Sequence, residues 1–417
     1  MTRMKDSGIE WIGEVPEEWG ITKLKYICGM QSGNNLTSLE ISSESDGGNI
    51  FPVYGGNGQR GYYSDFRNEG NYCLVGRQGA LAGNVHFVSG KFWATDHAIV
   101  VYEHIHTYSK YLYYLLKVMN LNQYAFETSA QPGLSVEKIL QLETIHCPKG
   151  EQSQIADFLD KKVAQLDKVK SLLEEQIKTL EDYRQSLIYE TVTKGLDKTV
   201  PLKDSGVDWI GQIPEGWGIT KIKFTTQLNG RIGWQGLTSA EYKEEGPYLI
   251  TGTDFLDGKI NFETAVHIDE KRWFEAKQIQ VENGDLLITK DGTVGKVAII
   301  EGLNERASLN SGVLRIQTTE NISRRFLFYV LKSDVFWLWF NYTNSGASTI
   351  LHLYQNVFDE FSFTLPNVSE QNQIIDFLDK KTEQINQMIA IKKEQIENIN
   401  KQRQTLIYDV VTGKRRV

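Results

Sequence analysis

The chain has 417 residues, of which 40% are hydrophobic and 24% charged, and it carries a formal net charge of −8. This composition is that of a globular protein of two to four domains, while the three scattered cysteines exclude a disulfide framework and a zinc site. No apolar run reaches the length of a membrane span and the N-terminus lacks a signal-peptide pattern, so we expect a cytoplasmic protein with no membrane contact.

The first predicted element, within residues 5–25, is a short helix or turn that leads into a strand. This segment recurs at residues 203–223, where 15 of 21 positions are identical at an offset of 198. Such a match points to an internal repeat, and repeats constrain a fold more strongly than any single motif.

Two divergent segments follow the two copies, at residues 27–150 and 225–369. Both are rich in Gly, Tyr, Val, Ile and Thr. Alternating runs predict strands at 97–102 and 313–318, and apolar periodicity predicts helices at 108–119 and 324–340. The two segments share only fragments, of which the clearest is LVGRQGALAGNV (74–85) against LITKDGTVGKV (287–297). We therefore predict two irregular α+β modules with different surfaces.

A long helix is predicted after each module. Residues 151–162 match residues 370–381 at ten of 12 positions, and residues 151–192 contain no Pro or Gly. A heptad repeat runs along each copy, through Leu159, Leu166, Leu173, Leu180 and Leu187 in the first and Leu378, Ile385, Lys392, Ile399 and Leu406 in the second. Apolar residues widen this seam at Val163, Val169, Ile177, Met388, Ile389 and Ile396. About 40 residues at about 1.5 Å each give a coiled-coil rod of about 60 Å. The alternative is that each helix packs onto its own module.

The repeat predicts an α+β fold in which two irregular mixed α/β modules are separated by two long antiparallel coiled-coil helices with pseudo-twofold symmetry. The expected boundaries are 1–150 for the first module, 151–195 for the first helix, 196–369 for the second module and 370–417 for the second helix. The C-terminus ends where the first copy would restart, so the two chain ends should lie close together near one module.

Motifs of DNA-modifying enzymes are absent from the sequence. There is no Pro-Pro as in amino-methyltransferases and no Pro-Asp as in common nucleases, and no Gly-Lys pair is followed by Ser or Thr as in a P-loop. Asp160-Lys161-Lys162 and Asp379-Lys380-Lys381 mimic the end of a nuclease motif, but a solvated helix face explains them better. The sequence therefore favours a non-catalytic recognition protein.

Several segments resemble type I restriction–modification specificity (S) subunits. They are the repeated opening KDSG-x-E/D-WIG, the run YGGNGQRGYYSDF (54–66) with GKFWATDHAIVV (90–101), and the repeated helix start E-Q-x-Q-I-x-x-F-L-D-x-K. The resemblance covers essentially the whole chain. It implies two target-recognition domains that each read one half of an asymmetric, interrupted site in double-stranded DNA.

The resemblance also implies partners. Two methyltransferase (M) subunits would dock on the chain and hold S-adenosylmethionine, and motor-nuclease (R) subunits would use ATP and Mg²⁺. The chain itself would bind none of these cofactors and no metal. The other functions considered are a stand-alone two-module repressor or architectural DNA-binding protein, and a coiled-coil scaffold with no role on DNA.

Candidate DNA-binding residues are polar side chains in the Gly-rich turns, where side chains project and backbone can approach phosphate. In the first module they are Tyr54, Asn57, Arg60, Arg77, Gln78, Lys91 and His97. In the second they are Arg231, Trp234, Thr253, Lys290, Lys296 and Asn310. The alternative for each residue is a solvated turn, and for Tyr54 and Trp234 a packing role. Because the net charge is −8, we expect DNA contact through local basic faces.

Overall fold

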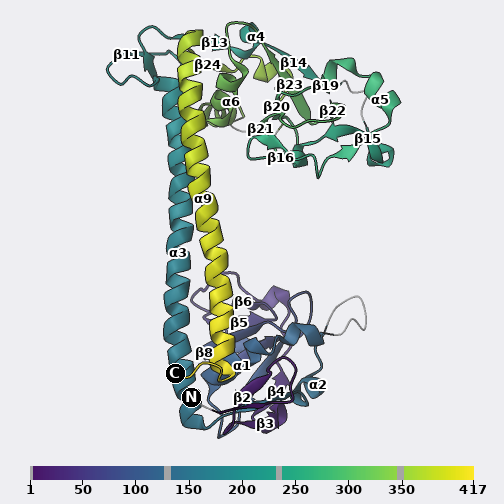
Figure 1. Ribbon diagram of the computed structural model, residues 1–417, viewed down its shortest axis with the longest axis vertical. Helices are drawn as coiled ribbons and strands as arrows, with labels where there is room; N and C mark the ends of the chain where they lie inside the picture. The colour runs from purple at the N-terminus through teal and green to yellow at the C-terminus, as the bar shows by residue number, and fades with distance from the viewer. Residues whose placement is uncertain (1–2, 126–132, 232–236, 345–351) are drawn as a thin grey trace. The chain divides into compact units, whose positions relative to one another are not determined.

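The computed structural model describes residues 3–125, 133–231, 237–344 and 352–417. The chain forms two compact units, one of Met1–Leu173 with Lys393–Val417 and the other of Glu174–Lys392. Each unit contains parts of two long helices, α3 (Lys149–Lys194) and α9 (Val368–Val411). We call the part of the first unit that precedes α3 module 1, and the segment between α3 and α9 module 2 (Figure 1).

Module 1 is built around one large sheet. The module begins with a separate two-stranded hairpin of β1 (Met4–Asp6) and β2 (Glu14–Pro16). Strand β3 (Gly20–Lys23) then pairs antiparallel with β10 (Glu143–His146). The main sheet has six strands in the order β4-β9-β7-β8-β5-β6. These are β4 (Cys28–Ser32), β5 (Phe51–Gly55), β6 (Gly58–Tyr63), β7 (Asn68–Gly76), β8 (Val85–Ala94) and β9 (Ala98–Glu103). Helices α1 (Ser109–Val118) and α2 (Val136–Leu140) and the 3-10 turn η3 (Leu121–Tyr124) follow.

Module 2 repeats this plan and then diverges from it. Its small sheets pair β11 (Leu202–Asp204) with β12 (Gln212–Pro214), and β13 (Gly218–Lys221) with β24 (Ser362–Leu365). A four-stranded sheet has the order β14-β23-β20-β21, from β14 (Thr226–Gly230), β20 (Leu286–Thr289), β21 (Val297–Ile299) and β23 (Val313–Thr318). A second sheet has the order β18-β15-β22-β19, from β15 (Lys243–Ile250), β18 (Val266–His267), β19 (Gln280–Val281) and β22 (Ala307–Leu309). The shorter elements are α4 (Ile222–Thr225), η6 (Gly252–Asp254), β16 (Phe255–Leu256), β17 (Lys259–Ile260), α5 (Glu270–Phe274) and α8 (Gln355–Phe358).

The duplication therefore extends into the divergent middles. The order β4-β9-β7-β8 in module 1 corresponds strand by strand to β14-β23-β20-β21 in module 2. In both modules one further parallel pairing is shared. In module 1, β5 pairs in parallel with β8, the strand that precedes β9, as Tyr54 pairs with Ala94. In module 2, β15 pairs in parallel with β22, the strand that precedes β23, as Ile250 pairs with Leu309. Sequence identity is low here because the shared feature is backbone pairing, which many apolar sequences satisfy.

Two elements differ from their predicted form. The opening segment contains the predicted turn, at residues 17–18, and the predicted strand, β3, but a hairpin that was not predicted precedes them, in which β1 and β2 pair from Met4 with Pro16 to Asp6 with Glu14. The predicted helix 324–340 is two helices, α6 (Arg324–Lys332) and α7 (Asp334–Thr343). Ser333 between them has extended backbone (ψ 168°), and its hydroxyl accepts the N–H of Val335, which caps α7.

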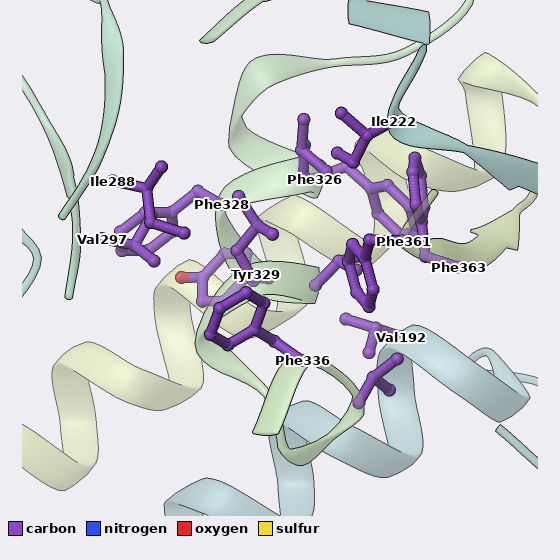
Figure 2. Packing of buried hydrophobic residues seen from close by; sticks show 14 of the residues in the cluster. Val192, Ile222, Ile288, Val297, Phe326, Phe328, Tyr329, Phe336, Phe361 and Phe363 are labelled. Carbon is purple, nitrogen blue, oxygen red and sulfur yellow. The ribbon is translucent and has the colours of Figure 1, made fainter. Parts of the chain in front are cut away.

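The core of module 2 is dominated by aromatic rings. Figure 2 shows Phe326 and Tyr329 of α6, Phe336 of α7, and Phe361 and Phe363 at β24 gathered around one centre. Val192, near the C-terminal end of α3, belongs to the same fully buried cluster. The last turn of α3 is thus part of the core of module 2. Each fully buried side chain of this size contributes about 1.5–3 kcal/mol.

Helices α3 and α9 run antiparallel. In the first unit Arg403 contacts Asp167, and in the second Lys392 donates to Gln176 (2.6 Å) while Arg184 pairs with Asn386. Every apolar heptad residue is buried or half-buried, as predicted, but the flanking Val169 and Met388 are exposed. The seam is therefore narrower than the sequence suggested. Together with the two modules, these helices confirm the predicted α+β fold with an internal repeat.

The repeated helix start holds each helix to its own module. The buried amide of Gln152 accepts the N–H of Tyr108 (2.8 Å) and donates to the carbonyl of Cys147 (2.7 Å). Gln371 repeats this in the second unit, where it accepts the N–H of Ser323 (2.8 Å) and donates to the carbonyls of Asn321 and Pro366. The alternative that each helix packs on its own module therefore describes the first turns, antiparallel pairing describes the middle, and the last turns pack against the core of the other module.

Asp160 and Asp379 lie on a partly solvated helix face, as predicted, but each also contacts its own module. Asp160 accepts the hydroxyl of Tyr114 (2.7 Å) and pairs with Lys110 (2.8 Å). Asp379 accepts the hydroxyl of Tyr329 and pairs with Arg325 (2.8 Å). Burial, reinforced by the aspartate, raises the pKa of Tyr329 to about 12. Asp160 thus attaches α1 to α3, and Asp379 attaches α6 to α9.

The chain ends lie together in the first unit, as predicted. The hydroxyl of Tyr408 on α9 donates to the carbonyls of Trp11 and Ile12 (both 3.0 Å), and Arg416 pairs with Glu18 and Glu151. Near its C-terminal end, α9 thus takes the place in module 1 that the end of α3 takes in module 2.

Replacing Tyr408 by phenylalanine is expected to lower the free energy of unfolding of the first unit by about 1 kcal/mol, because the carbonyls of Trp11 and Ile12 lose their shared donor. Urea denaturation followed by hydrogen exchange of peptides covering 5–25 measures the loss. Tyr183→Phe on α3 is the control, since Tyr183 is 54% exposed. An equal effect of the two substitutions would contradict the assigned contact.

Within the described ranges, no helix is both long and apolar enough to cross a membrane. Cys28, Cys73 and Cys147 are all free and buried. Burial raises the pKa of the Cys28 and Cys147 thiols to about 12, which leaves them unreactive near neutral pH.

Candidate nucleic-acid interface

Three loops of module 1 converge at one end of its main sheet. They are the turn after β5, the loop 77–84 between β7 and β8, and the turn 95–97 between β8 and β9. The N–H of Arg77 donates to the carbonyl of His97 (2.9 Å), and the N–H of Thr95 donates to the carbonyl of Tyr54 (2.8 Å). A Cβ on Gly56 would lie 3.0 Å from the carbonyl oxygen of His97, so the first turn touches the third.

Module 2 has the same convergence. Its loops are η6 after β15, the loop 290–296 between β20 and β21, and the turn 310–312 between β22 and β23. The N–H of Lys290 donates to the carbonyl of Gly312 (2.8 Å), and that of Asn310 to the carbonyl of Ile250 (2.9 Å). The Lys296 ammonium reaches the carbonyl of Gly252 (3.4 Å), which joins the second loop to the first.

The two loop clusters share one set of backbone hydrogen bonds. Arg77 and Lys290 occupy equivalent positions, since each donates to the third loop and each accepts the N–H of a leucine, Leu134 (2.8 Å) or Leu353 (2.9 Å). The bonds that close the second loop repeat as well: the N–H of Gly83 donates to the carbonyl of Gly76 (2.8 Å), and that of Gly295 to the carbonyl of Thr289 (2.9 Å). Because these bonds use backbone atoms alone, they leave the side chains at the same positions free to differ.

The structure brings most of the module 1 candidates together. Asn57 and Gln78 are exposed in the first and second loops, and Arg77 and His97 are half-buried beside them. Arg60 packs over Gly55 at the start of the first turn. Gln31, Ser32, Arg77, Gln78 and Lys138 line a neighbouring cavity of about 600 Å³.

Tyr54 and Lys91 are placed differently from the other module 1 candidates. Tyr54 packs edge-on against Phe92 with ring centroids 5.7 Å apart, and burial raises the pKa of its hydroxyl, so its ring has the packing role considered as the alternative. Lys91 is exposed on β8, where it contacts Glu69 (3.8 Å) and lies over the ring of Phe66 (4.6 Å), and none of these contacts belongs to the loop cluster.

In module 2, Thr253 and Lys296 are exposed and Lys290 and Asn310 are half-buried in the loop cluster. Arg231 is 6% exposed and holds the fold together, because its guanidinium donates to the carbonyl of Leu309 (2.9 Å) and the hydroxyl of Ser308 (3.0 Å). Burial, with Arg272 nearby, lowers the pKa of Arg231 to about 10, so it stays charged at neutral pH. Trp234 lies outside the described residues.

Sequence reasoning missed Asn84, Gln31 and Lys138. Asn84 is the equivalent of Lys296, because their carbonyls accept the N–H groups of Gly76 and Thr289 (both 2.9 Å). The matched fragments 74–85 and 287–297 contain both residues, so the repeat could have identified Asn84 once Lys296 was chosen. Gln31 and Lys138 join Arg77 only through long-range packing, for which the sequence holds no signal.

The clusters present different chemistry on this common backbone. Arg77, Gln78 and Asn84 in module 1 correspond to Lys290, Asp291 and Lys296 in module 2. Arg, Lys, Gln and Asn are the side chains that read base edges, and cations also neutralise phosphates. Asp291 is paired with His352, which orders the second loop of module 2. The two clusters therefore differ in the side chains that they present at equivalent positions.

Comparison with known proteins identifies a family that matches both halves of the chain. A family described as "type I restriction modification DNA specificity domain" matches residues 16–181 and again 237–399. These two matches cover more than half of the chain. The chain belongs to this family.

Individual relatives of this specificity-domain protein agree with the assignment. The type I restriction enzyme EcoprrI specificity subunit of Escherichia coli is 41% identical over 33% of this chain and 34% of its own length. A putative type I restriction enzyme MjaX specificity subunit of Methanocaldococcus jannaschii is 24% identical over 97% of this chain and 96% of its own. The chain thus spans about a third of the first relative in alignment and nearly all of the second.

A solved structure supports the fold of this specificity-domain protein over its whole length. A chain described under the assembly and conformational transition of the type I R-M system has a TM-score of 0.67 and 15% identity, and the match covers 95% of this chain and 98% of that one. At this identity the likeness concerns the fold, which is the two-module, two-helix arrangement predicted from the repeat.

Proposed function

We propose that this protein is the DNA sequence-specificity subunit of a type I restriction–modification system. The observation that carries the proposal is the pair of loop clusters, which have one backbone geometry and different base-reading side chains. Two such readers in one chain suit a target with two different half-sites. The target is therefore bipartite and asymmetric, and the chain itself is not an enzyme.

Within this function, the modules at 1–150 and 196–369 are the target-recognition domains. The residues that read the first half-site are Asn57, Arg60, Arg77, Gln78 and His97. Lys91, which lies outside the loop cluster, contacts the DNA backbone. Those of the second are Thr253, Lys290, Lys296 and Asn310. The segments 151–195 and 370–417 fix the spacing between the half-sites, as dimer geometry does in other DNA-binding proteins.

The partners follow from the same proposal. Two M subunits dock on the chain and methylate adenine with S-adenosylmethionine, and R subunits add ATP- and Mg²⁺-dependent cleavage. The repeated helix starts support this, since Gln152 and Gln371 make equivalent contacts and each unit therefore offers an equivalent docking surface. These cofactors are bound by the partner subunits and not by this chain. The protein acts in the cytoplasm, where it has access to the chromosome.

The test is methylome sequencing of cells with and without the gene for this chain, while the neighbouring methyltransferase gene is expressed. We expect one bipartite adenine-methylated motif to disappear when the specificity gene is deleted. An unchanged methylome would refute the proposal. Sequence-specific DNA binding by the chain alone, without any methylation, would favour a stand-alone repressor instead.

A further inference from the structure

The second loop of each cluster, 77–84 in module 1 and 290–296 in module 2, packs against residues that come just after the first helix following the main sheet. In module 1, a Cβ on Gly83 would collide with the backbone of Leu121 and Asn122 in η3. In module 2, a Cβ on Gly295 would lie 2.8 Å from the ring of Phe336 and 2.9 Å from the indole of Trp337, both in α7. Both glycines have positive φ, 96° and 83°, so the turn geometry and the close approach each require glycine.

Asn122 and Trp337 are equivalent residues on two independent grounds. The helix sequences KYLYYLLK (110–117) and RFLFYVLK (325–332) align without a gap, and Asn122 and Trp337 follow at the same distance. The contacts with Gly83 and Gly295 give the same equivalence from the structure. Each residue therefore supports the equivalent turn, one step before Asn84 in module 1 and Lys296 in module 2.

Asn122 fixes the orientation of Asn84. The Nδ2 of Asn122 donates to the carbonyl of Ala82 (2.7 Å) and to the Oδ1 of Asn84 (3.2 Å). The acceptor end of the Asn84 amide is thus turned toward η3. Its Nδ2 makes no hydrogen bond to any residue that the structure describes, and Asn84 is half-exposed, so it presents donors outward.

Trp337 has the corresponding place in module 2. Its ring packs edge-on against Phe336 (5.5 Å between centroids) and Phe340 (5.9 Å), yet 37% of its surface is exposed beside the turn. An anchored indole of this kind holds the backbone of Gly295, and with it the ammonium of Lys296. Lys296 also presents only donors.

We infer that Asn84 is a specificity-determining residue of the first half-site, the counterpart of Lys296 in the second, and that Asn122 and Trp337 are the positioning residues of these two readers. This inference rests on the proposed function. Because both readers offer donors, each selects a base with a major-groove acceptor, such as the N7 and O6 of guanine or the O4 of thymine.

The test uses the full chain with its methyltransferase subunit, expressed in cells that carry a plasmid library of single-base variants of the mapped motif. Asn84→Ala is expected to lower the preference for one base in one half-site by about 5- to 100-fold, and Asn122→Ala is expected to weaken the preference at the same position. Asn84→Asp, which reverses the hydrogen-bonding sense, should shift that position toward cytosine or adenine, whose edges carry donors. Gln123→Ala, next to Asn122, is the control and should leave the motif unchanged.

Trp337→Ala should alter one position of the other half-site, Trp337→Phe should restore it, and the exposed neighbour Leu338→Ala should have no effect. Unfolding of each variant is measured in parallel. Folded variants that keep the original motif, that change both half-sites, or that lose methylation of every sequence would overturn the inference. If the wild-type complex itself yields no bipartite motif, the proposed function fails, whereas a wild-type motif unaffected by these substitutions refutes the inference alone.

Discussion

Replacing Gln371 by alanine is expected to lower the free energy of unfolding of the second unit by about 3 kcal/mol. The amide is fully buried, and its loss would leave the N–H of Ser323 and the carbonyls of Asn321 and Pro366 without this partner. An unsatisfied buried polar group costs about 1–3 kcal/mol, and some of the cost would be recovered by water or local movement.

The effect of Gln371→Ala is measured by urea denaturation of the full chain, with hydrogen exchange of peptides from 323–331 to assign the loss to α6. Gln373→Ala on the same helix is the matched control, because Gln373 is exposed. Gln152→Ala should produce an equal loss in the first unit, since Gln152 makes the same contacts there. Indistinguishable stability of the Gln371 and Gln373 variants would show that the amide does not hold the helix start.

The second large effect concerns recognition. Arg77→Ala and Lys290→Ala are each expected to reduce methylation of the native target by about 10- to 100-fold, because a good contact to a base edge is worth about 1–3 kcal/mol. The two substitutions should act on different halves of the motif, since the residues occupy equivalent positions in separate modules.

The measurement for Arg77 and Lys290 is the methylation rate of plasmids that carry single-base variants in each half-site. Lys259→Ala is the charge-matched control, because Lys259 is exposed on β17 and pairs with Glu301 away from the loop cluster. A uniform loss over all target variants, with a weaker salt dependence, would instead identify a phosphate contact. No loss in either variant would remove these two residues from the interface.

The sequence predicted the features of the fold that depend on local periodicity. The heptads at 159–187 and 378–406 identified both long helices, and the alternating runs 97–102 and 313–318 identified β9 and β23. Ser333 was missed because a helix break set by a single buried hydroxyl leaves the apolar pattern of 324–340 intact. The roles of Asp160 and Asp379 were missed because their tyrosine partners lie 46 and 50 residues earlier in the chain.

The site was predictable only in part. Gly-rich turns marked the three loops, and Arg77, Gln78, Lys290 and Lys296 do lie in the two clusters. Arg231 was chosen for its charge, yet its place beside Leu309 depends on a contact across 78 residues that no local pattern reveals. Convergence of the loops depends on strand order, and strand order is set by pairing between distant segments.

The backbone hydrogen bonds that join the three loops of each module have a consequence for how new specificities arise. Since these bonds involve no side chain, residues such as Asn57, Gln78 and Thr253 can vary while the loop geometry is kept. A library randomised at these exposed positions should therefore contain mostly folded proteins, and changes in target preference should appear at little expense in stability. Natural variants could explore recognition by the same route, one half-site at a time.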